Sequence, residues 1–131
     1  MFKHMEWAPE LYAHAIAVER EAALRYAELA SRTAEQGSQA ARLFAEFAGL
    51  QAAHLAALQR RTAKIALPDL TSDHTWPEGG HPVARALQAE RDARAFFAQA
   101  ARVAREPTAR AIADEMAGEE TEHIARLELL I

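Results

Sequence analysis

The side chains of this 131-residue chain that could do chemistry are acidic, amide and histidine groups placed on otherwise apolar helical stripes. Apolar residues recur at helical spacing in four segments, and each stripe is interrupted near its middle by polar residues. These are Glu19, Gln51, His54, Glu90, Glu120 and His123. A carboxylate on a core-facing stripe costs several kcal/mol unless it is paired or bound to a cation. The arginines lie mostly off these stripes, so the pattern indicates a multivalent cation.

The interruptions repeat between the two halves of the chain. Gln51 is followed three residues later by His54, and Glu120 is followed three residues later by His123. Residues at i and i+3 share a helix face, so both members of each pair can reach one site. The segments AVEREAALRY and LQAERDARAFF are also similar, which indicates an internal duplication.

The elements that must position these side chains are four helices. Pro9, Pro82 and Pro107 fall where first-turn prolines are tolerated, Ser38 is a candidate N-cap, and Gly37 should end the first helix. We expect helices over about residues 9–35, 38–65, 82–105 and 107–131. The sequence therefore predicts an all-α fold in one domain spanning residues 1–131.

The connection between the second and third helices decides the topology. Residues 66–81 form the one long irregular stretch, with two prolines and a Gly-Gly pair. Placing Gln51 and Glu90 at one level requires a crossover of about 33 Å. The seventeen residues from Ile65 to Pro82 can span roughly 56 Å. Two antiparallel helical hairpins joined by a crossover along the bundle are therefore feasible.

A Glu from two helices plus Glu-x-x-His from the other two is the arrangement of di-iron carboxylate bundles. From about Tyr12 to Leu127 the chain resembles the rubrerythrin branch of the ferritin-like superfamily, whose fold is a four-helix bundle. The resemblance rests on Glu19 with Tyr26, on FAEFAGLQAAH, on Glu90 with Phe97, and on MAGEETEH.

The resemblance implies two iron ions, with Glu19 and Glu90 as terminal ligands, Glu120 as a bridging ligand, and His54 and His123 as one nitrogen ligand each. Tyr26 and Phe97 would pack beside the ligands. It also implies an oxidoreductase that reacts with peroxide or dioxygen. The alternatives are a ferritin-like protein that sequesters iron without turnover, and a degenerate bundle. Manganese or zinc could replace iron in each case.

One ligand position departs from the family pattern. Gln51 stands where the family has Glu, and an amide carbonyl ligates weakly and brings no charge. With two divalent ions and three carboxylates, the site would keep a net charge of +1. Gln51 is therefore either a weak ligand or a packing residue, and one or both metals could be lost.

Composition restricts the remaining function classes. The chain has no cysteine, which excludes a disulfide framework and a built-in rubredoxin-type centre, so a redox enzyme would need a separate electron donor. The net charge is −4 with no basic stripe, so we expect no nucleic-acid partner. With neither a signal peptide nor a membrane-spanning apolar run, we expect a cytoplasmic protein.

Exposed outer-face Ala and Leu and the crossover Trp76 favour a homodimer, in which hairpins could be exchanged.

Other titratable residues lie off the stripes. His14 lies about 140° around the helix from Glu19 and is expected to be solvated. The same angle excludes Glu46 and Glu115 from the site. His4, His74 and His81 fall in predicted tails or loops and receive no role.

Overall fold

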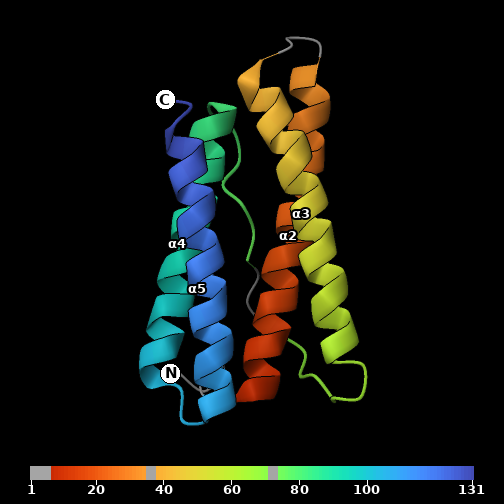
Figure 1. Cartoon of the computed structure of the whole chain (residues 1–131), viewed down its shortest axis with the longest axis vertical. Helices are drawn as coiled ribbons and strands as arrows, with labels where there is room; N and C mark the ends of the chain where they lie inside the picture. Colours follow the sequence, from red (N-terminus) through yellow and green to blue (C-terminus); the bar gives the residue numbers. More distant parts are fainter. Residues whose placement is uncertain (1–6, 35–37, 71–73) are drawn as a thin grey trace.

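The computed structural model describes residues 7–34, 38–70 and 74–131, which form four long helices and, within those ranges, no strand. The helices are α2 (Ala8–Thr33), α3 (Gln39–Arg61), α4 (Pro82–Val103) and α5 (Pro107–Glu128). In Figure 1, α2 and α5 run upward and α3 and α4 run downward. The chain is thus two antiparallel hairpins joined by a crossover along the bundle, which confirms the predicted all-α four-helix bundle.

The helix starts follow from local sequence chemistry. The side chain of Ser38 accepts a hydrogen bond from the backbone N–H of Ala41, as expected for an N-cap. A proline stands in the first turn of α2, α4 and α5. The backbone N–H of Ala8 donates to the Glu106 carboxylate, which ties the start of α2 to the start of α5. The predicted stop at Gly37 lies outside the described residues.

The helix α3 ends earlier than predicted, at Arg61 rather than near Ile65. Thr62 caps its end, with both its backbone N–H and its hydroxyl bonded to the carbonyl of Leu58. Ile65 is exposed and does not continue the buried stripe, contrary to the prediction. Beyond Thr62 the chain turns toward the crossover, so there is no helix surface for Ile65 to cover.

The crossover covers one side of the bundle and corrects two expectations. His14 is 2% exposed rather than solvated, because the crossover places His74 against it. Their ring nitrogens, Nδ1 of His14 and Nε2 of His74, are 2.7 Å apart, and Phe96 packs against both rings. Trp76 is half-buried, with its ring edge-on to Tyr26 at 4.9 Å, so it packs within the chain.

The apolar core is divided into two clusters. One cluster lies where α2 and α5 begin and includes Leu11, Phe97 and Met116. The other lies toward the opposite end of the bundle and includes Tyr26 and Phe44. The polar residues of the stripes lie in the layer between them. None of the helices, over the residues described, is long and apolar enough to span a membrane.

Candidate metal centre

Side chains from all four helices meet in the polar layer at the middle of the bundle. Each was predicted from its stripe: Glu19 on α2, Gln51 and His54 on α3, Glu90 on α4, and Glu120 and His123 on α5. The three carboxylates are 2% exposed or less, and only His54 is substantially accessible, with a side chain 34% exposed. The structure arranges these donors in two groups, one fully buried and one partly open.

The inner group consists of Glu90, Glu120 and His123, whose candidate ligand atoms all lie within 4.8 Å of one another. His123 Nδ1 is 3.1 Å from Glu90 Oε2. The Tyr26 hydroxyl donates a 2.6 Å hydrogen bond to the same oxygen. When the carboxyl groups are ionised, neither oxygen of Glu120 has a hydrogen-bond donor within the described structure. Two carboxylates and an imidazole that converge in this way form a donor set suited to one transition-metal ion.

Gln51 lies beside the inner group and is 1% exposed. Its Nε2 is 3.1 Å from His123 Nδ1, and its Oε1 has no partner among the described residues. The amide therefore contacts a candidate ligand without adding charge. Its position fits either a weak oxygen ligand, after rotation of the amide, or a neutral neighbour that orients the imidazole.

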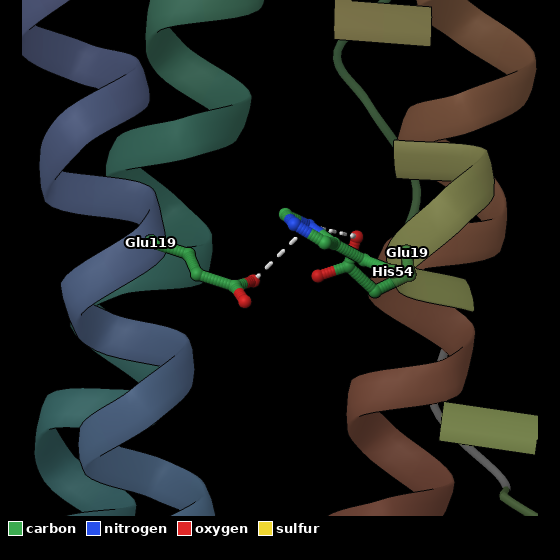
Figure 2. A group of neighbouring side chains, drawn as sticks. All are labelled: Glu19, His54 and Glu119. Atoms are coloured by element: carbon green, nitrogen blue, oxygen red, sulfur yellow. Dashed lines mark ion pairs between the residues drawn. The ribbon is translucent and has the colours of Figure 1, made fainter. Parts of the chain in front are cut away.

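The outer group consists of Glu19, His54 and Glu119, and their candidate ligand atoms also lie within 4.8 Å of one another. Figure 2 shows His54 between the two carboxylates, with Glu119 reaching across from α5. His54 Nδ1 is 3.5 Å from Glu119 Oε2 and 3.9 Å from Glu19 Oε2. Both oxygens of the buried Glu19 carboxyl lack a hydrogen-bond partner in the described structure.

The electrostatics of the layer follow from burial and from like charges. Desolvation, followed by repulsion from Glu119 and Glu90, raises the pKa of Glu19 to about 9. Desolvation and the adjacent Glu90 carboxylate also raise the pKa of Glu120 well above its usual value. Burial opposes ionisation of Glu90, but the Glu120 carboxyl, His123 and Tyr26 outweigh it and lower the pKa of Glu90. The site thus holds protons that a bound cation would displace.

The arginines do not neutralise these buried carboxylates. Among the described residues, arginines on α3, α4 and α5 instead form exposed pairs on the bundle surface. These pairs are Arg61 with Glu115, Arg91 with Glu128, and Arg126 with Glu46. Glu46 and Glu115 are therefore outside the donor groups, as predicted. The unpartnered oxygens of Glu19 and Glu120 are the observation that fits a multivalent cation.

Glu119 was not predicted from the sequence. It lies one position before Glu120 and therefore about 100° around α5, off the apolar stripe that was used to find the other residues. Its side chain is 25% exposed. The available signal was the consecutive Glu pair within MAGEETEH. Of the two predicted neighbours of the ligands, Tyr26 contacts Glu90, whereas Phe97 is a fully buried core residue that packs against Phe96.

Comparisons with known proteins bear on the fold. No known family model matches this sequence. No curated protein matches it either. Among solved structures, the chain is similar to an uncharacterized conserved protein from Magnetospirillum magnetotacticum MS-1, with a TM-score of 0.89 and 28% identity. The likeness covers 95% of this chain and 93% of that one. It therefore extends over the whole bundle and supports the all-α architecture.

Proposed function

We propose that this protein is a rubrerythrin-like, dinuclear metal-binding oxidoreductase that holds two iron ions and reacts with peroxide or dioxygen. The proposal depends on one observation: two adjacent Glu/His groups lie in the bundle core, and two of their buried carboxyls, Glu19 and Glu120, have no hydrogen-bond partner within the described chain. Mixed carboxylate and imidazole donors suit iron, and manganese or zinc could take the same donors. The absence of cysteine still requires a separate electron donor, and a reducing, cytoplasmic setting would suit one.

The residues present would divide the work as follows. Glu19 and His54 would hold one ion and Glu90 and His123 the other; Glu120, which groups with the inner donors, would take the shared role that the resemblance assigns to it. Iron bound there would supply electrons to a small oxidant. Tyr26 would orient Glu90 through its hydrogen bond, and the two apolar clusters would keep bulk water away from the inner group.

A small pocket lies beside the outer group and opens to solvent. A pocket of about 50 Å³ is lined by Glu19, His54, Glu119 and neighbouring residues of α3 and α5. One water molecule occupies about 30 Å³ in the liquid, so the pocket admits an oxidant the size of peroxide or dioxygen.

The test begins with anaerobic titration of the metal-free protein with ferrous iron, followed by metal analysis. We expect two ions per chain and a peroxide-dependent oxidation of the reduced protein, followed by optical absorption. Gln51→Glu should bind at least as tightly. Uptake of two ions without any reaction with peroxide would favour the alternative, a protein that sequesters iron without turnover. A wild type that takes up no ion, while Gln51→Glu takes up two, would identify a degenerate site and refute the proposal.

We also propose a homodimer, since Leu24 and Leu50 are exposed on outer faces. Size-exclusion chromatography with light scattering at several concentrations tests it. A mass near the 14.4 kDa of one chain at every concentration would rule it out.

A further inference from the structure

Glu119 and Glu120 are consecutive on α5 but face different neighbours. Successive helix positions differ by about 100°, so Glu120 belongs to the inner group while Glu119 reaches toward α3. Glu119 Oε2 is 3.5 Å from His54 Nδ1, across the space between α3 and α5 (Figure 2). Among the described residues, this Glu119 oxygen has no hydrogen-bond partner.

An independent observation points to a cation between these side chains. Glu19 is fully buried, and neither of its carboxyl oxygens has a hydrogen-bond partner in the described chain. Its carboxyl lies in the same group as His54 and Glu119, with the nearest oxygen 3.9 Å from His54 Nδ1. Metal–ligand bonds to oxygen and nitrogen are about 2.0–2.2 Å long. Small side-chain adjustments would therefore allow one ion to contact all three donors.

The charges of the predicted ligands and of two divalent ions do not balance. Glu19, Glu90 and Glu120 contribute three negative charges, whereas two divalent ions carry four positive charges. Gln51, beside the inner group, contributes none. A buried net charge is expensive, and a fourth carboxylate would bring the site to neutrality.

We propose that Glu119 is this fourth carboxylate: it binds the outer ion together with Glu19 and His54 and compensates for Gln51. This inference rests on the proposed function and adds to it a residue from the opposite side of the layer. The carboxylate that balances the charge thus comes from α5 rather than from α3.

The assignment makes the two ions unequal. The inner donors are all buried, whereas the side chains of His54 and Glu119 are 34% and 25% exposed. The outer group also borders the small pocket near the exposed Arg61–Glu115 ion pair. The outer ion should therefore be the one that a chelator removes first and that an entering oxidant meets first.

The experiment compares Glu119→Gln with Glu122→Gln in anaerobic ferrous-iron titrations, using calorimetry and metal content after gel filtration. Both variants remove one negative charge from α5, but Glu122 is exposed and lies in neither donor group. We expect Glu119→Gln to bind one ion normally and the second at least tenfold more weakly. Glu122→Gln should match the wild type. Adding Gln51→Glu to Glu119→Gln should restore the second ion.

The outcomes separate this inference from the proposed function. If the wild type binds two ions and Glu119→Gln binds both with unchanged affinity, the inference fails while the proposed function stands. Equal weakening of both ions in the Glu119 variant would also overturn its assignment to the outer ion. If Gln51→Glu does not restore the second ion in the Glu119→Gln background, Glu119 does not compensate for Gln51. If the wild type binds no metal, the proposed function itself fails. Far-UV circular dichroism establishes that each variant is folded.

Discussion

The Tyr26 hydroxyl donates a 2.6 Å hydrogen bond to Glu90 Oε2, so a residue seven positions after the α2 carboxylate supports the carboxylate of α4. The duplicated position, seven after Glu90, is Phe97, which has no hydroxyl to donate. The two carboxylates differ accordingly. Glu90 has a lowered pKa, whereas Glu19 has no hydrogen-bond partner in the described structure and its pKa is raised to about 9. The two halves of the internal repeat therefore differ in the hydrogen bonds that their Glu90 and Glu19 carboxyls receive.

Tyr26→Phe should destabilise the metal-free protein by about 1.5–3 kcal/mol, because it removes a buried hydrogen bond to a charged carboxylate. Urea denaturation measures the change in the free energy of unfolding. Tyr12→Phe is the matched control, since the Tyr12 hydroxyl lies only 3.4 Å from an exposed arginine, and it should cost less than about 1 kcal/mol. Equal losses in the two variants would show that the Glu90 contact does not stabilise the fold.

Phe97→Tyr should have its effect at the other half of the site. If Phe97 lies beside Glu19 as Tyr26 lies beside Glu90, the new hydroxyl would donate a hydrogen bond to Glu19 and lower the pKa of that carboxyl. The expected result is a smaller dependence of stability on pH in the metal-free protein. Thermal melts of wild type and variant between pH 5 and pH 8 measure it. An unchanged pH dependence would mean that Phe97 does not occupy the counterpart of the Tyr26 position.

The metal-free protein should lose stability as the pH rises from about 5 to 8. The pKa of Glu19 is about 9 in the folded chain and near 4.5 when unfolded, so the folded state binds the extra proton throughout this range. Its contribution is fully present below the unfolded pKa and is lost as the pH approaches the folded one. One such carboxyl contributes a slope of up to about 1.4 kcal/mol per pH unit.

Glu19→Gln is the control for this pH dependence. The neutral amide matches the protonated carboxyl in shape, so the variant should be similar to wild type near pH 5 and more stable near pH 8. Denaturant melts at both pH values measure the difference. A slope in Glu19→Gln equal to that of the wild type would assign the pH dependence to other groups.

Bound metal should reverse that loss of stability. An ion present at one hundred times its dissociation constant stabilises the folded state by about 2.7 kcal/mol per site, which corresponds to a rise in Tm on the order of 10 °C. Glu120→Gln should reduce the shift, because Glu120 is in the inner group. Glu46→Gln, in an exposed ion pair with Arg126, should leave it unchanged. A shift of equal size in both variants would point to metal binding elsewhere.

His14→Ala should destabilise the protein by about 1–3 kcal/mol without changing the metal content. The substitution removes a buried ring that packs on Phe96 and contacts His74 of the crossover. His14 is in neither donor group. Urea denaturation and metal analysis on the same samples separate the two effects. A loss of bound metal in a folded variant would show that the crossover influences the site.

Much of the fold and most of the candidate site could be predicted because the information is local. Helical spacing of apolar residues marked the four helices, and the Ser38 cap marked the start of α3. Glu19, Glu90 and Glu120 were identifiable because a carboxylate on an apolar stripe is costly wherever the helices pack. These are properties of one helix at a time, and the structure brings all of these side chains into one layer.

The tertiary structure alone decided which residues off the stripes enter the interior. His14 is buried because the crossover covers its face of α2, and Glu119 reaches His54 because α5 lies opposite α3. Neither contact is encoded in the periodicity of a single helix, since each depends on where a distant segment passes. The sequence by itself determined the four helices and the polar layer. The division of that layer into a buried and an open donor group came from packing between helices.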